Sequence, residues 1–227
     1  MRRHLWIAAL LFGVIAPGAR ANTITLTTPL VSTTSGGPVD ASAAFTIGAG
    51  AITITLTNLE ANPTSIAQLI SGLDFTLSTG ATTGTLASSS GQQITVNGGG
   101  TFVLGSTVAT GWGLNGNVSG GLQLDALGFI GPKGLILGPP GGSTYSNANG
   151  SIAGNGPHNP FLNQTATFVV DVTGVTASTS ITGATFLFGT TAGANIVKAP
   201  EPSTISLLLI GFGFLVVMRK RIVPSFQ

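Results

Sequence analysis

The chain has 227 residues, of which only 6% are charged, and it contains no cysteine. Disulfide frameworks, cysteine-ligated metal sites and thiol nucleophiles are therefore excluded. Between Asn22 and Ala199 there are two basic and five acidic residues, which gives this body a net charge of −3. Because nucleic-acid binding needs a cationic surface that displaces phosphate counterions, that class of function is also disfavoured.

The first 21 residues have the layout of a secretory signal peptide. Two arginines at positions 2–3 are followed by an apolar run over residues 5–15 and by Ala19-Arg20-Ala21, a small-x-small cleavage site. We predict that Ala19 and Ala21 direct cleavage, so that the mature chain begins near Asn22. An uncleaved signal anchor is the alternative, but a Pro-Gly pair just before the cleavage site disfavours a continuing helix.

The body, residues 22–190, shows the period-2 alternation of apolar and polar residues that is typical of half-buried strands. Strands are expected around Ile24 and Leu26, Phe45 and Ile47, Ile52 to Leu56, Leu73 to Leu77, Ile94 and Val96, Phe102 and Leu104, Leu122 and Leu124, Ala166 to Val172, and Thr185 to Phe188. The pattern predicts an all-β fold, a single β-sandwich of the jelly-roll or immunoglobulin-like type.

Glycine-containing loops predict two hairpins, one closed by residues 48–50 and the other by residues 97–100. A short helix or turn is expected at 66–70, where apolar residues are spaced i, i+3, i+4, and Gly72 would end it. Residues 128–160 hold nine glycines and five prolines, which predicts a long loop or a pair of loops.

Candidate catalytic residues in the body are few. His158 is its only histidine, so any Ser-His-Asp triad or histidine-ligated zinc would have to use it. We interpret it as a loop histidine held by a hydrogen bond. No EF-hand spacing surrounds Asp40 or Asp125, although a calcium site built from either with backbone carbonyls stays open.

Five scattered carboxylates leave a glycoside hydrolase open as an alternative, because that reaction needs two carboxyl groups on either side of the scissile bond. No local motif marks a pair among Asp40, Glu60, Asp74, Asp125 and Asp171. We therefore assign no catalytic residue, metal or cofactor.

Two aromatic residues in glycine-rich surroundings could contact a glycan. Trp112 and Tyr145 each combine a large ring with a polar group, as an exposed sugar platform does. The competing interpretation places Trp112 at the end of the core. Residues 111–116 also match G-x-G-x-x-G, but no helix is predicted after them, so we interpret this segment as a turn rather than a dinucleotide site.

The last stretch has the features of a membrane anchor. Pro200-Glu201-Pro202 precedes an uncharged, mostly apolar run over residues 203–218, and Arg219-Lys220-Arg221 follow. A helix over this run would span roughly 24 Å, slightly less than a hydrocarbon core of about 30 Å. Since a basic cluster favours the cytoplasmic side, the body would lie across the membrane from it.

These C-terminal features resemble the PEP-CTERM sorting domain of Gram-negative surface proteins. In that family the triplet corresponding to Pro200, Glu201 and Pro202 is the recognition motif, and Arg219, Lys220 and Arg221 correspond to its basic cluster. The resemblance implies an exosortase as partner, cleavage near the motif, and passage of the body towards the cell exterior. An ordinary C-terminal anchor is the alternative.

We therefore divide the chain into a signal peptide (1–21), a β-sandwich domain (22–190), a linker (191–199) and a sorting segment with a transmembrane helix (200–222). The expected function is that of a non-enzymatic cell-surface or extracellular-matrix protein. Before processing it would sit in the inner membrane with its body in the periplasm. A carbohydrate-binding module of the exopolysaccharide matrix is the alternative.

Overall fold

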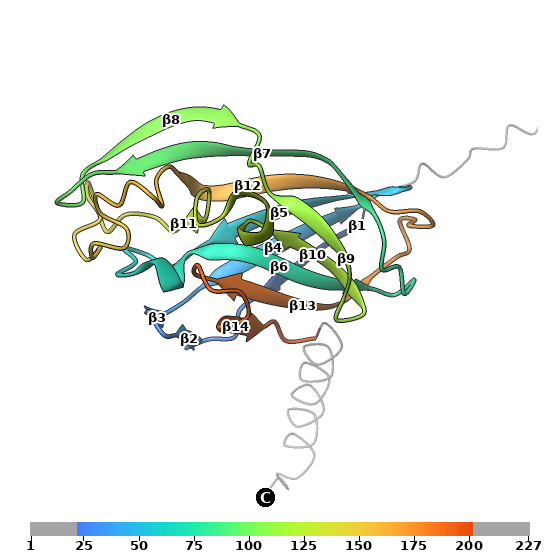
Figure 1. The fold of residues 1–227 in the computed structure, drawn as a ribbon. Coiled ribbons are helices and arrows are strands. Elements are labelled where there is room, and N and C mark those ends of the chain that lie inside the picture. The colour runs from blue at the N-terminus through green and yellow to red at the C-terminus, as the bar shows by residue number, and fades with distance from the viewer. Residues whose placement is uncertain (1–21, 202–227) are drawn as a thin grey trace, which may run out of the picture.

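The computed structural model describes residues 22–201, which form one all-β body (Figure 1). The elements, in chain order, are β1 (Asn22–Thr27), β2 (Thr33–Thr34), β3 (Gly37–Pro38), β4 (Ala41–Ile47), β5 (Ala51–Asn58), the 3-10 helix η1 (Ile66–Gln68), β6 (Ile70–Leu77), β7 (Thr85–Val96), β8 (Phe102–Val108), β9 (Gly113–Val118), β10 (Gly121–Asp125), α1 (Leu127–Ile130), β11 (Ile136–Leu137), β12 (Phe161–Asp171), β13 (Ile181–Phe188) and β14 (Asn195–Lys198).

Twelve of these strands belong to one hydrogen-bonded network, and β2 and β3 pair separately. One arm of the network has the order β1-β4-β5-β12-β7-β8, and the other has the order β14-β13-β6-β10-β9. The short β11 joins them, because it pairs parallel with β12 and antiparallel with β6. The predicted all-β class and the single body are confirmed, and the jelly-roll or immunoglobulin-like layout stays a prediction.

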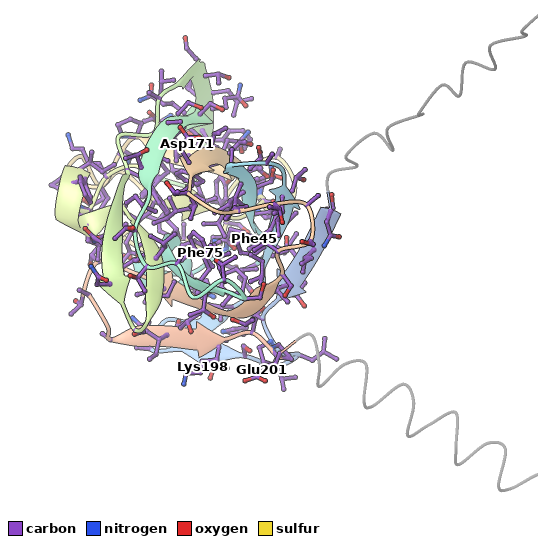
Figure 2. All side chains as sticks on the ribbon, turned by 90° about the vertical axis from the view of Figure 1, so that its right-hand side faces the viewer. Phe45, Phe75, Asp171, Lys198 and Glu201 are labelled. Atoms are coloured by element: carbon purple, nitrogen blue, oxygen red, sulfur yellow. The ribbon has the colours of Figure 1, made fainter. Side chains whose placement is uncertain are left out.

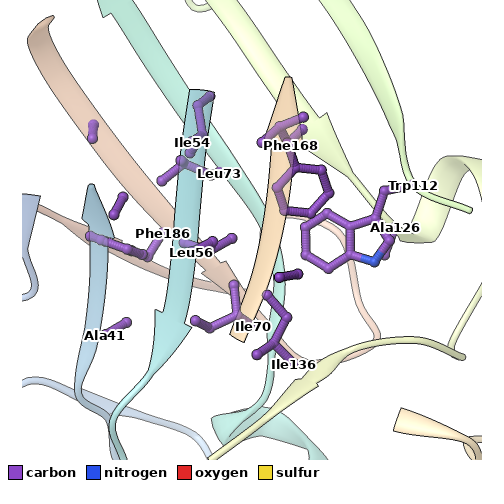
Figure 3. Close-up of a cluster of buried hydrophobic side chains, with 14 of the residues drawn as sticks. Ala41, Ile54, Leu56, Ile70, Leu73, Trp112, Ala126, Ile136, Phe168 and Phe186 are labelled. Carbon is purple, nitrogen blue, oxygen red and sulfur yellow. The ribbon is translucent and has the colours of Figure 1, made fainter. Parts of the chain in front are cut away.

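The two arms share one core. Phe45 on β4 and Phe75 on β6 belong to different arms, yet their ring centroids are 5.7 Å apart and both rings point into the interior (Figure 2). Figure 3 shows Ile54, Leu73 and Phe168 converging on the same interior from three strands. Alternation produces this core: every second residue of β4 and β5 is buried, and the threonines between them are half-buried on the outer face.

Both predicted hairpins are present. In β4-β5 the register pairs Ile47 with Ile52, and Gly50 takes the positive φ of 76° that the turn needs. In β7-β8 the backbone N–H of Asn97 donates to Thr101 O at 2.7 Å, which closes the second loop. The glycine-containing loops were therefore sufficient to predict both hairpins from the sequence.

The predicted helix is a single 3-10 turn with a capping box at Ser65, but the expected end at Gly72 is wrong. The helix stops at Gln68, and Gly72 lies inside β6. A Cβ at position 72 would come within 2.8 Å of Leu124 O on β10, so this glycine allows close strand approach.

The glycine- and proline-rich segment 128–160 is mostly loop, as predicted, and contains only the end of α1 and β11 as regular elements. Several of its residues are buried, including Leu135, Ile136, Tyr145 and Ile152. The loop therefore covers part of the core.

No helix within residues 22–201 has the length and apolar character needed to cross a membrane. The predicted signal peptide, residues 1–21, and the predicted transmembrane helix, residues 203–218, lie outside the described part of the chain.

Candidate functional site

The C-terminal junction, residues 195–201, carries the chain from the folded body to the Pro-Glu-Pro triplet. Residues 195–198 form β14, which pairs antiparallel with β13 and places Lys198 opposite Thr185. The segment 191–199, predicted as a linker, therefore includes a strand, and the folded body runs beyond residue 190. This pairing is stabilised by Val197, whose half-buried side chain packs against the core.

Strand pairing reaches the residue before the triplet. The backbone N–H of Ala199 donates to Ala184 O at 2.9 Å, and Ala199 is only 8% exposed. Pro200 is half-buried and Glu201 is exposed. Lys198 and Glu201 lie together at the surface where the chain leaves the body (Figure 2). Within the described residues, backbone pairing with the body thus reaches Ala199, the residue immediately before the predicted recognition motif.

The start of β14 is held by the turn between β2 and β3. Asn195 Oδ1 accepts hydrogen bonds from the backbone N–H of Ser35 at 3.0 Å and from Ser35 Oγ at 2.9 Å. These two contacts join positions far apart in the sequence and fix the first residue of the junction.

A pocket of about 360 Å³ opens beside the junction. Strands β6, β13 and β14 line it, together with residues 118–119 at the end of β9. Its charged lining residues are Asp74, Lys198 and Glu201. A neighbouring pocket of about 260 Å³ shares Asp74 with it and also includes Asp125.

Asp74 and Asp125 are connected by a row of amide side chains across β6, β10 and β9. Gln123 Nε2 donates to Asp74 Oδ1 at 2.8 Å. Asn115 Nδ2 donates to Gln123 Oε1 at 3.0 Å and to Asp125 Oδ2 at 3.2 Å. Burial raises the pKa of Asp74, and the charge of Asp125 adds to the rise, while the hydrogen bond from Gln123 opposes it. The sequence analysis missed this row, and the i, i+2 spacing of Gln123 and Asp125, which puts both on one face of a strand, is the local signal that could have indicated it.

The Asp125 carboxylate also holds the start of α1. Its oxygens accept hydrogen bonds from the backbone N–H groups of Leu127 at 2.8 Å and Gly128 at 3.2 Å. Its contacts are thus those of a cap and a strand-to-strand link.

The remaining carboxylates lie elsewhere in the body. Burial raises the pKa of Glu60, and the nearby charge of Asp40 contributes. Asp171, at the end of β12, lies well away from Lys198 and Glu201 (Figure 2). Within residues 22–201 no group of three or more histidine, cysteine, aspartate or glutamate side chains is placed to hold a metal ion.

Trp112 and Tyr145 do not form an exposed glycan platform, which corrects that expectation. Trp112 is 4% exposed, packs at a tilt against Phe168 with 5.1 Å between ring centroids (Figure 3), and donates from Nε1 to Gly134 O at 2.9 Å. Tyr145 is 1% exposed and donates from its hydroxyl to Gly138 O at 2.9 Å. Burial raises the pKa of the Tyr145 hydroxyl well above its usual range. Large rings with satisfied polar groups are typical of cores.

His158 is a half-buried loop residue whose Nδ1 lies 2.6 Å from Ser151 O. Because a carbonyl can only accept, Nδ1 is the protonated nitrogen in this contact. The geometry is that of the hydrogen-bonded loop histidine interpreted from the sequence.

The G-x-G-x-x-G segment is not a turn throughout, because residues 113–118 form β9. Its glycines allow close packing instead. A Cβ at Gly113 would overlap the ring of Phe129, and a Cβ at Gly116 would lie 2.7 Å from Thr82 O. Glycine is therefore needed at these positions because other segments of the chain pack directly against the backbone of β9.

Several predicted site residues lie outside the described residues: Ala19, Ala21, Pro202, Arg219, Lys220 and Arg221. Of the recognition triplet, Pro200 and Glu201 are described.

Residues 198–221 match the family model of the PEP-CTERM protein-sorting motif. The match confirms the resemblance and includes the Pro-Glu-Pro triplet and the basic cluster. It begins at Lys198, inside β14. The motif implies an exported, membrane-sorted protein of Gram-negative bacteria that an exosortase processes. No curated protein and no solved structure matches the chain.

Proposed function

We propose that this chain, which carries a PEP-CTERM sorting motif, is a non-enzymatic protein of the cell surface or extracellular matrix. The observation that carries the proposal is the order of parts: the all-β body is paired as far as Ala199, and the sorting motif, residues 198–221, begins at the end of its last strand. The signal peptide would start export, the C-terminal helix would hold the body on the periplasmic side of the inner membrane, and the exosortase would then release it.

The hydrogen bonds of Asp74 and Asp125 support a structural role for these two carboxylates. The Asp74 carboxylate and the amides of Gln123 and Asn115 form a chain of hydrogen bonds, and Asp125 accepts from the first backbone N–H groups of α1. A hydrolase pair would instead need two carboxyl groups that face a substrate from opposite sides. The glycan-binding alternative rested on Trp112 and Tyr145, whose burial removes its support.

The mature termini test this function. The full chain is expressed in a Gram-negative host with its exosortase, and the product is analysed by intact-mass spectrometry. We expect a chain that begins at Asn22, ends near residues 200–202 and lacks Arg219 to Arg221. Replacing Pro200, Glu201 and Pro202 with alanines should leave the full C-terminus attached. Recovery of the intact C-terminus from the unmodified chain would refute the proposal.

A further inference from the structure

We propose that the exosortase can act on this chain only after β14 has separated from β13, so that the last strand of the fold controls release of the body. The inference rests on the proposed function and adds a condition to it. The substrate of the exosortase would be the C-terminal junction, residues 195–201, with β14 detached from β13.

Spacing is the first reason. Ala199 is the last residue that the described structure shows hydrogen-bonded to the body, and the apolar run starts in earnest at Ile205. Between these two residues a fully extended chain spans at most about 20 Å. The body is therefore held close to the membrane, and an enzyme that cuts near Pro-Glu-Pro must fit into this narrow interval.

Backbone access is the second reason. Enzymes that take a peptide segment in extended form recognise its backbone N–H and C=O groups as well as its side chains. On the N-terminal side of the triplet, the Ala199 N–H is already bonded to Ala184 O, and Ala199 is only 8% exposed. Ala199, the second residue of the family match, is thus covered by the fold.

The strand is built so that it can leave. It has four residues, Ile196 is 53% exposed, and Val197 is only half-buried. On β13, by contrast, Phe186 and Phe188 are fully buried. Separation of β14 would therefore cost few buried apolar contacts and would keep the core closed, as local opening of a terminal element does.

Opening would also solve the spacing problem. Once residues 195–199 are free, the turn before them, residues 190–194, becomes part of the tether as well, while the Gly189 N–H stays bonded to Leu69 O. Ten additional extended residues lengthen the reach by about 33 Å. The two Ser35 contacts to Asn195 Oδ1 are the polar contacts that must break at the far end of the junction.

A disulfide between β13 and β14 tests the inference. Thr185 and Lys198 are direct cross-strand partners, and the Ala199–Ala184 hydrogen bond one residue away places them at a non-hydrogen-bonded position. Cα atoms at such positions lie about 4.5 Å apart, within disulfide range. Because the natural chain has no cysteine, Thr185→Cys with Lys198→Cys can form only this one bond within the chain.

The exosortase is induced after the disulfide has formed in the periplasm, and release is followed with and without a thiol reductant. We expect release of the oxidised variant to be at least tenfold slower than that of the same variant under reductant. The reduced variant is the matched control for any effect of losing Lys198 itself. Equal release in both states would overturn the inference and leave the proposed function intact.

A second variant separates access from recognition. Ten glycine and serine residues inserted between Ala199 and Pro200 give the enzyme a free segment without opening β14. We expect the insertion to restore release of the oxidised disulfide variant. Failure of the insertion to rescue would show that the closed strand does not act through access. If the unmodified chain is not released at all, the proposed function fails rather than this added condition.

Discussion

Three buried polar side chains converge on one short segment of the long loop. Asn58 Nδ2 donates to Ile136 O at 2.9 Å, Trp112 Nε1 to Gly134 O and the Tyr145 hydroxyl to Gly138 O. All three acceptors lie in or beside β11, the strand that joins the two arms of the network. A buried carbonyl without a hydrogen bond costs about 1–3 kcal/mol. By donating to these carbonyls, the three side chains remove that cost at the strand that joins the two arms.

The pH dependence of stability can be predicted for Asp74. Burial and the charge of Asp125 raise its pKa in the folded state, so the folded protein holds this proton more tightly than the unfolded chain does. Ionisation of Asp74 therefore destabilises the folded protein. This destabilisation is absent below the unfolded pKa of about 3.9 and is fully present above the folded pKa.

Asp74→Asn should remove that cost and still accept the hydrogen bond from Gln123. We expect the variant to melt at a higher temperature than the unmodified protein at pH 7, with the difference shrinking toward pH 3. Thermal unfolding of both proteins across this range measures the effect. A difference independent of pH would mean that packing, rather than ionisation, separates the two proteins.

At the scale of elements, the hairpins could be predicted and β14 could not, for a physical reason. Residues 48–50 and 97–100 carry glycines between alternating strands, so the information is local. In β14 only Val197 packs against the core, so the segment shows no alternating pattern. A strand could be predicted there only if its partner β13 were already known. Gly72 and Gly113 were misinterpreted likewise, because the atoms that crowd them come from distant segments.

The β7-β8 hairpin offers a matched pair of glycine substitutions. Gly100 has a φ of 81°, and a Cβ there would overlap the backbone of Tyr145, whereas a Cβ at Gly98 would meet nothing within 4 Å. We expect Gly100→Ala to lower the free energy of unfolding by about 2 kcal/mol or more, and Gly98→Ala to change it by no more than about 0.5 kcal/mol. Urea unfolding measures both. Similar losses in the two variants would contradict the close approach of Tyr145 to this turn.

At the scale of the whole molecule, composition and the two ends of the chain could predict export and sorting, but they could not predict how the strands are arranged. The two arginines before an apolar run and the Pro-Glu-Pro triplet before another are contiguous signals, and the C-terminal one is confirmed by the family match. How the two arms close over one core depends on pairings such as β11 with β6, which joins residues 66 positions apart at Ile136 and Ile70. No local pattern encodes such a contact.

The weak attachment of β14 has a consequence for the isolated body, without any enzyme. Chain 22–194 lacks β14 but keeps Phe186 and Phe188, and it should still unfold cooperatively, with a free energy of unfolding lowered by about 1–3 kcal/mol relative to chain 22–201. Chain 22–180 loses both rings with β13 and should not fold, since each buried phenylalanine is worth several kcal/mol. Trp112, the one tryptophan in the body, reports burial by its fluorescence during urea unfolding. If chain 22–194 proved unfolded, β14 would be an essential part of the core, and its separation could not precede release of an intact body.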